Sequence, residues 1–296
     1  MASITALRSA MTTAVMPRSP EASELPLMSS EALVLENVTR AFGALRAVDD
    51  VSLSVLAGEK RAILGANGAG KTTLFNAITG DFPPTAGRIL FFGEDITLLD
   101  PYERIRKGMR RTYQSSLLFR DLSVRDNLFL AVRGVSNARF SLRRPGRNHP
   151  TTVATQELLE RGRLTHLSEE LVSNLAHGQQ RQLEIAMTLA TEPQVLLLDE
   201  PFGALDHQTR EMMQELLQGI WEAERKTVLF VTHDIDEAIF MGNRVVVMSA
   251  RPGRIKCDWP VALSYPRHYS VKTTPPFAEL KARLTEEIRI EVMGVH

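Results

Sequence analysis

Apolar residues recur along this chain with two different periods, and each period predicts a type of element. Residues 51–55 alternate strictly between apolar and polar, which is typical of a half-buried antiparallel strand, and residues 33–40 have a similar character. Short and mostly apolar runs predict buried strands at 61–64, 195–198, 228–231 and 245–248. Residues 87–92 predict one further strand.

Helical spacing occurs between these strands. Residues 71–79 place Leu74, Phe75 and Ile78 on one face and stop at Gly80, so they predict a short helix. Residues 124–132 predict a second helix and residues 209–221 a third. The third helix has a predicted apolar face of Met212, Met213, Leu216, Leu217 and Ile220. Strands that alternate with helices indicate an α/β fold with a mostly parallel sheet covered on both sides.

The ends of the chain differ from its middle. Residues 1–30 lack a sustained apolar pattern and are expected to be a disordered tail, with an organellar transit peptide as the alternative. Residues 31–250 hold the main domain, in which residues 115–184 are more helical and more charged. Residues 251–296 form an extension that ends in an amphipathic helix. The apolar stripe of that helix, Phe277, Leu280, Leu284 and Ile288, is expected to pack on the main body, a partner interface being the alternative.

Composition excludes several classes of protein. The chain has 296 residues, with 35 Lys and Arg and 35 Asp and Glu, so its net charge of zero argues against a nucleic-acid-binding protein. Cys257 is the single cysteine, which excludes an internal disulfide framework and fits a reducing compartment. No apolar run approaches the roughly 18 residues of a membrane helix. Any membrane-spanning part must therefore belong to another chain. A basic stretch at residues 140–150 predicts a solvated loop, or a contact with lipid headgroups or a partner.

A complete phosphate-binding loop follows the strand at 61–64. Residues 65–72 match the pattern Gly-x4-Gly-Lys-Thr/Ser between a predicted strand and a predicted helix. Backbone N–H groups of such a loop, together with the positive end of the helix, bind phosphate oxygens. Lys71 is expected to reach the β- and γ-phosphates, and the Thr72 hydroxyl to bind Mg²⁺. The predicted nucleotide-binding residues here are Gly65, Ala66, Asn67, Gly68, Ala69, Gly70, Lys71, Thr72 and Thr73.

Two later buried strands end in residues suited to catalysis. Asp199 and Glu200 follow the strand at 195–198, on the edge of a parallel sheet where ligands bind. Asp199 is expected to bind Mg²⁺, and Glu200 to act as the general base that polarises the attacking water. His233 follows the strand at 228–231; its imidazole can donate a hydrogen bond without a fixed charge.

A further motif lies just ahead of Asp199. The sequence Asn174-Leu-Ala-His-Gly-Gln-Gln-Arg181 resembles the signature loop of ATP-binding cassette (ABC) ATPases, whose usual form is Leu-Ser-Gly-Gly-Gln. Ala176 replaces the Ser of that pattern and His177 replaces the first Gly. Together with the phosphate loop and the acidic strand end, this motif gives a resemblance that covers about residues 31–250.

The resemblance implies a P-loop, RecA-like α/β core with an antiparallel β subdomain and an α-helical subdomain inserted at about 115–184. It implies roles in ATP binding and hydrolysis for Gln114, which also binds Mg²⁺, and for the switch residue His233. Phe42 is implied to stack on adenine, although a core Phe is the alternative, and Asp206 to lie in the loop that crosses between two cassettes. The signature residues Leu175, Ala176, His177, Gly178 and Gln179 are implied to bind the nucleotide of a second cassette. Ala176 removes a hydroxyl donor, but a helix starting after Gly178 would keep backbone donors, so we expect an active ATPase.

Two parts of the chain resemble different importers. Residues 175–186 are similar to cassettes that import branched-chain amino acids or urea, whereas residues 199–206, 232–238 and 250–255 are similar to those that import nitrate, sulfonates or taurine. The resemblance implies an importer ATPase that is peripheral to the cytoplasmic face of the plasma membrane. Its implied partners are a second ABC ATPase subunit, two transmembrane permease subunits and a periplasmic or extracellular substrate-binding protein, and its cofactors are ATP and Mg²⁺. The alternatives are a soluble cassette that serves assembly or repair and a nucleotide-binding regulator without turnover.

Overall fold

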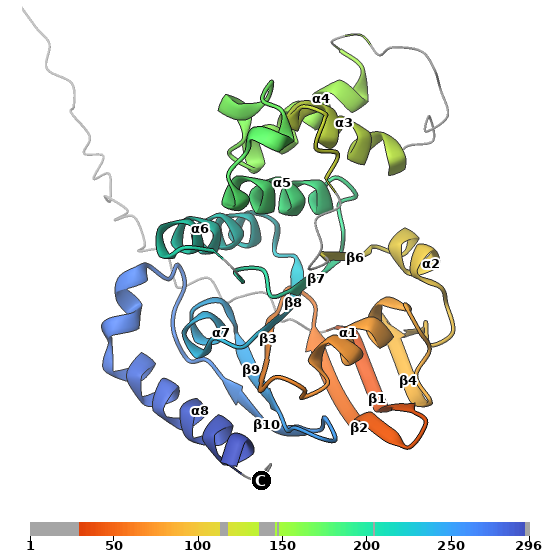
Figure 1. Cartoon of the computed structure of the whole chain (residues 1–296), viewed down its shortest axis with the longest axis vertical. Helices are drawn as coiled ribbons and strands as arrows, with labels where there is room; N and C mark the ends of the chain where they lie inside the picture. The colour runs from red at the N-terminus through yellow and green to blue at the C-terminus, as the bar shows by residue number, and fades with distance from the viewer. Residues whose placement is uncertain (1–29, 113–117, 136–145, 147, 204, 294–296) are drawn as a thin grey trace, which may run out of the picture.

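Two β-sheets organise the part of the chain that the computed structural model describes, namely residues 30–112, 118–135, 146, 148–203 and 205–293. The larger sheet has the order β10-β9-β3-β8-β7-β6 (Figure 1). The strand β10 is antiparallel to β9, and the other five strands run parallel to one another. Its strands are β3 (Lys60–Gly65), β6 (Met109–Thr112), β7 (Val195–Asp199), β8 (Thr227–Thr232), β9 (Arg244–Met248) and β10 (Ile255–Pro260).

The smaller sheet is antiparallel and has the order β2-β1-β4-β5. Its strands are β1 (Glu31–Phe42), β2 (Leu45–Leu56), β4 (Ala86–Phe91) and β5 (Glu94–Asp95). The predicted strands at 33–40 and 51–55 are thus confirmed as parts of longer strands. The strand β10 was not predicted, although Ile255, Cys257 and Trp259 alternate with Lys256 and Asp258 as in a half-buried strand.

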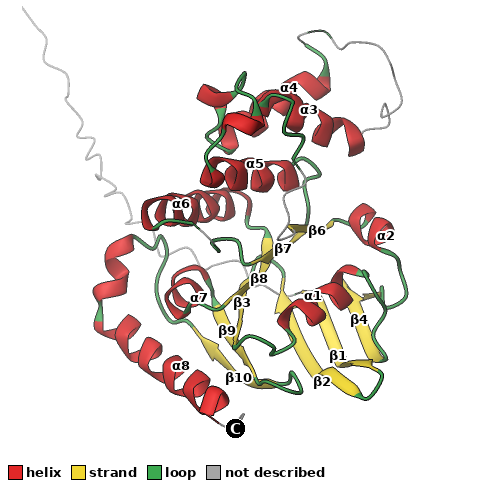
Figure 2. Cartoon of the chain, in the orientation of Figure 1, coloured by secondary structure: helices red, strands yellow, loops and turns green. Residues whose placement is uncertain are grey.

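Helices cover the larger sheet and extend beyond it (Figure 2). The α-helices are α1 (Lys71–Thr79), α2 (Pro101–Arg106), α3 (Val124–Val135), α4 (Pro150–Arg161), α5 (His177–Leu189), α6 (His207–Glu224), α7 (Ile235–Met241) and α8 (Pro275–Met293). Short 3-10 helices occupy Thr165–Leu167, Val172–Asn174 and Tyr269–Thr273. The described helices include none that is both long and apolar enough to span a lipid bilayer.

Side chains of the central strands alternate between two hydrophobic cores. On β7, Val195 and Leu197 join the core shared with α1 and the antiparallel sheet, whereas Leu196 and Leu198 join the core under helices α3 to α8. This alternation follows from the period of two along a strand. Because both faces are buried, the strands are almost wholly apolar, as expected for a parallel sheet between two layers.

The predicted apolar faces of α8 and α6 can be compared with the packing in the structure. The stripe on α8 packs on the main body: Phe277 and Leu284 are buried, and Leu280 and Ile288 lie against the same core. On α6 the predicted face is confirmed except for Met212, which is 40% exposed. An apolar residue at the edge of a helical stripe fits the pattern without contacting the core.

Candidate functional site

The phosphate-binding loop joins β3 to α1, as predicted. Gly68 and Gly70 have left-handed φ values of 83° and 79°. A Cβ on Gly70 would lie 2.4 Å from the carbonyl oxygen of Ala47, so both the backbone conformation and the space require glycine there. The Lys71 ammonium donates hydrogen bonds to the carbonyl oxygens of Gly65 (2.7 Å) and Ala66 (3.0 Å). Burial lowers the pKa of Lys71.

A cavity of about 350 Å³ opens beside this loop. Six consecutive residues of the loop and of α1, from Gly68 to Thr73, line it together with Glu200. The remaining lining residues come from β2 and from the segment after β9: Leu45, Arg46, Ala47 and Arg251. A cavity bounded by a helix N-terminus, Lys71 and arginines suits a polyanionic ligand.

Phe42 ends β1 close to this cavity's Leu45 and is 46% exposed, so the alternative of a buried core residue is wrong. Its ring lies edge-on to that of Phe82, with centroids 5.6 Å apart. The Arg40 guanidinium lies 4.6 Å from the Phe42 ring centroid. An exposed ring held from one side leaves aromatic surface for stacking.

The two predicted carboxylates lie at the carboxyl end of β7 but differ in environment. Asp199 is 1% exposed; its Oδ2 accepts a hydrogen bond from the Arg111 guanidinium at 2.7 Å. Asp199 Oδ1 is buried and has no hydrogen-bond partner among the described residues. Glu200 has a strained left-handed φ of 44° and a partly exposed side chain that faces the cavity.

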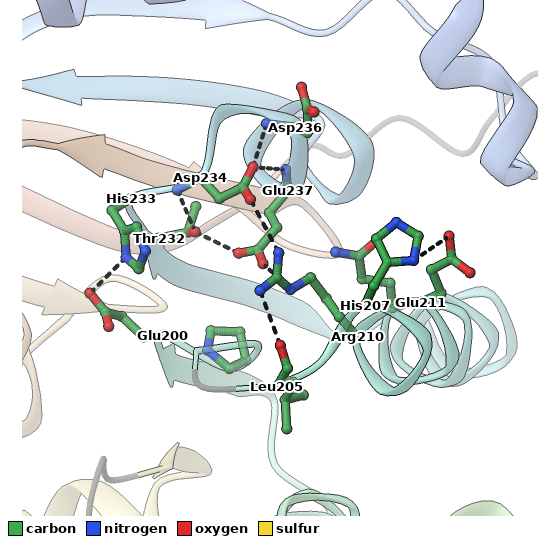
Figure 3. A network of polar contacts seen from close by, with 12 residues as sticks. Glu200, Leu205, His207, Arg210, Glu211, Thr232, His233, Asp234, Asp236 and Glu237 are labelled. Carbon is green, nitrogen blue, oxygen red and sulfur yellow. Dashed lines mark hydrogen bonds and ion pairs between the residues drawn. The ribbon is translucent and has the colours of Figure 1, made fainter. Parts of the chain in front are cut away.

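His233 follows β8 and meets Glu200, as Figure 3 shows. Its Nδ1 lies 3.3 Å from Glu200 Oε1, and its side chain is 61% exposed. Strands β7 and β8 are parallel neighbours, with Asp199 in register with Val231, so their ends bring these two side chains together. This contact is a hydrogen bond to the Glu200 carboxylate in the His233 tautomer that carries its hydrogen on Nδ1.

Arg111 belongs to the site but was not predicted from the sequence. It lies on β6, and its guanidinium donates to Asp199 of β7 and to Asn76 and Asp81 at the end of α1. It therefore ties the phosphate-loop helix to the buried carboxylate. The strand β6 was not among the predicted strands, so no local pattern marked Arg111 as a buried residue.

The signature segment begins helix α5. The helix starts at His177, not after Gly178 as expected, with Ala176 at its N-cap. The Ala176 side chain cannot cap the helix, whereas the Ala176 N–H donates to Gln179 Oε1 at 2.9 Å. Leu175 is buried and His177 is exposed. The residues that line the 350 Å³ cavity include none from Leu175 to Gln179.

Arg181, one turn further along α5, donates to the carbonyl oxygens of Asp199 (3.1 Å) and Pro201 (3.2 Å). It links the signature helix to the strand end that carries the carboxylates. Asp206 caps α6: its carboxylate accepts from the Thr209 N–H (3.1 Å) and hydroxyl (2.6 Å), and these hydrogen bonds lower its pKa. Gln114 and the basic side chains Arg143, Arg144 and Arg147 lie outside the described residues.

The residues present fit a bound Mg²⁺. This ion takes oxygen ligands, usually one or two carboxylates together with substrate phosphates. Asp199 offers a buried oxygen without a hydrogen-bond partner, and the Thr72 hydroxyl lies in the same cavity wall as Glu200. Within the described part of the chain there is no group of three or more His, Cys, Asp or Glu side chains that could hold a metal without phosphate.

Comparisons with known proteins agree with this geometry. The family model described as ABC transporter matches residues 48–203. A putative ATP-binding protein of Brucella abortus is 37% identical over 250 residues, which cover 84% of this chain and 90% of that protein. The taurine import ATP-binding protein of a Jannaschia species is 33% identical over 274 residues, covering 88% and 97%. The sulfate/thiosulfate import ATP-binding protein of Photorhabdus laumondii is 38% identical over 226 residues, covering 75% and 59%.

Solved structures show the same fold. The ADP conformation of MJ1267, an ATP-binding cassette of an ABC transporter, superposes with a TM-score of 0.69 at 27% identity, covering 85% of this chain and 98% of that one. A dimeric post-hydrolysis state of the ATP-binding cassette MJ0796, bound to ADP and Pi, gives a TM-score of 0.65 at 28% identity, covering 78% and 100%. The predicted fold class is therefore confirmed.

Proposed function

Because the chain belongs to the ABC transporter family, whose cassettes hydrolyse ATP to drive transport, we propose that it is the ATP-hydrolysing subunit of an importer. It works as a dimer of cassettes on two permease subunits, at the cytoplasmic face of the membrane, with a substrate-binding protein delivering the cargo. One observation carries the proposal: Lys71 and Glu200 line a cavity suited to a polyphosphate, and Asp199 and His233 lie beside Glu200 at the same carboxyl edge of the parallel sheet.

In this proposal each residue has a distinct task. Residues 65–73 bind the phosphates through backbone N–H groups and Lys71, and Phe42 stacks on the adenine. Glu200 accepts a proton from the attacking water, and His233, whose Nδ1 lies 3.3 Å from Glu200 Oε1, contacts the γ-phosphate. Gln114 is the remaining residue of the proposed catalytic set. Mg²⁺, held by Thr72 and Asp199, would neutralise charge on the phosphates when bound.

The signature residues are proposed to act on the nucleotide of the partner cassette. Residues 175–179 lie at the start of α5, where backbone donors and the helix end favour an anion. They do not line the cavity of their own chain. The dimeric structure of MJ0796 bound to ADP and Pi supports the pairing of two cassettes.

Substitution of Glu200 by Gln tests the catalytic assignment. Gln keeps the size of the side chain but cannot take a proton, so kcat is expected to fall about 100-fold or more while ATP affinity persists. Phosphate release and nucleotide binding are measured on the full-length chain with Mg²⁺, with Glu36→Gln, at the exposed Arg88–Glu36 pair, as the matched control. Hydrolysis near the wild-type rate would refute the role of Glu200.

For the cargo, we propose an oxyanion such as a sulfonate or sulfate rather than a branched-chain amino acid or urea. Relatives with these cargo names match at 33% and 38% identity, and the alignment with the taurine importer covers 88% of this chain. The test is ATPase stimulation in proteoliposomes that contain the co-purified permease and the binding protein. Taurine or sulfate should stimulate hydrolysis. Stimulation by leucine or urea alone would overturn the cargo assignment, and failure to co-purify with any membrane subunit would overturn the importer.

A further inference from the structure

A buried carboxylate lies near His233, on the far side of Thr232, and has no role in the proposed hydrolysis (Figure 3). Glu237, on α7, is 5% exposed, and its Oε2 accepts a hydrogen bond of 2.6 Å from the Thr232 hydroxyl. The same Thr232 oxygen accepts from the Asp234 N–H at 3.0 Å. Glu237 thus fixes, through one hydroxyl, the residues on both sides of His233.

A single arginine connects this carboxylate to another loop. Arg210, in the first turn of α6, places Nε 3.5 Å from Glu237 Oε1 and Nη1 3.6 Å from Asp234 Oδ2. Its Nη2 donates to the carbonyl oxygen of Leu205 at 3.2 Å. Figure 3 shows the guanidinium between the helix that follows His233 and the loop at Leu205. One planar group thus contacts both the segment after His233 and the loop that ends at Asp206.

The charges of Glu237 and Arg210 are expected to stabilise each other. Burial raises the pKa of Glu237 to about 7, and the nearby Asp234 carboxylate adds to the effect, while the Thr232 hydrogen bond, Arg210 and His233 oppose it. A buried carboxylate needs a compensating cation, and Arg210 is that cation. Lys281 is engaged by Asp236 on the outer side of α7.

We propose that Arg210 and Glu237 are positioning residues for hydrolysis, which hold His233 at its distance from Glu200 and tie that position to Leu205 and Asp206. The inference rests on the proposed function, in which His233 contacts the γ-phosphate. A displacement of the Leu205 carbonyl when a second cassette docks would shift the Arg210 guanidinium, and with it the Thr232–Asp234 segment. Neither residue lines the 350 Å³ cavity.

The test is a set of mutant cycles on the full-length chain. Glu237→Gln retains an acceptor for Thr232 but loses the charge, and Arg210→Gln removes the link to Leu205. Each is expected to lower kcat about 10-fold with KM and ATP affinity within about twofold, because only the geometry of the hydrolytic step changes. Arg210→Lys should restore little, since it lacks the planar fork. Arg88→Gln, at the exposed Arg88–Glu36 pair, is the matched control and should change nothing.

A His233→Ala background separates positioning from general damage. First, His233→Ala alone must lower kcat; if it does not, the proposed function of His233 fails. Given that loss, Glu237→Gln should cost less than twofold more in the His233→Ala background, because the group that it positions is gone. An equal loss in both backgrounds would overturn the positioning role. So would a melting temperature that falls in step with kcat for Glu237→Gln, or a loss confined to KM.

Discussion

Gly178, in the signature helix, is expected to be intolerant of any side chain for a reason that lies within a single chain. A Cβ added there would lie 2.1 Å from Thr209 Cγ2. Thr209 cannot easily turn away, because a β-branched side chain is restricted at χ1 and its hydroxyl donates to Asp206 at 2.6 Å. Overpacking of this kind costs about 1–3 kcal/mol, and the better helix propensity of Ala returns at most about 1 kcal/mol of that.

The structure supplies a specific rescue. Thr209→Ser removes the clashing methyl group but keeps the hydroxyl bond to Asp206; the nearest remaining Thr209 atoms are then Cβ at 3.3 Å and Oγ1 at 3.4 Å. Gly178→Ala should therefore lower the melting temperature by roughly 2–10 °C, and Gly178→Ala with Thr209→Ser should recover most of the loss. Thermal and urea unfolding measure both variants, with Thr209→Ser alone as the control.

The same variants separate packing from a contact in trans. If the stabilised double variant regains full ATPase activity, the sensitivity of Gly178 comes from α6 and not from a partner's phosphate. If stability returns but hydrolysis does not, the proposed contact in trans gains support. A double variant as unstable as Gly178→Ala would refute the steric reasoning itself.

Three further predictions concern other parts of the site. Ala176→Ser should stabilise the chain by about 1 kcal/mol in urea unfolding, because Ser can cap α5, and an unchanged midpoint would contradict this. Arg111→Gln should lower the free energy of unfolding in urea by about 3–5 kcal/mol, because it leaves the buried Asp199 carboxylate without its cation. A decrease of less than about 1 kcal/mol, which is typical of an exposed ion pair, would contradict this. Lys60, whose ammonium lies 4.0 Å from two aromatic ring centroids, has a pKa that burial lowers to about 6. Since the unfolded chain binds the proton more tightly, stability should rise between about pH 6 and 10, and Lys60→Met should flatten that rise in unfolding midpoints.

Local patterns predicted much of this molecule because they depend on neighbours in sequence. The bounds of α1 agree with those read from the spacing of Leu74, Phe75 and Ile78, and the phosphate loop follows a strand as expected. The position of Asp199 and Glu200 at the carboxyl edge of the sheet followed from a general rule, that ligands of such folds bind at this edge. No long-range contact had to be known to reach either conclusion.

The contacts that could not be predicted join residues that are distant in sequence. Arg111 and Asp199 are far apart along the chain, and nothing local in either segment names the other. Arg210 and Glu237 are hidden for the same reason, since each is a charged residue on a helix and would ordinarily face solvent. The predicted site residues are assigned to nucleotide and Mg²⁺, so they do not identify the cargo.

The alternation of β7 between two cores has a mechanical consequence. Each central strand is clamped on both faces, so bending the strand that carries Asp199 would open voids in two close-packed interiors at once. The sheet is therefore expected to act as a stiff frame. The side that binds nucleotide and the side that bears α3 to α5 share this sheet, so a displacement of its strands is expected to move both sides together.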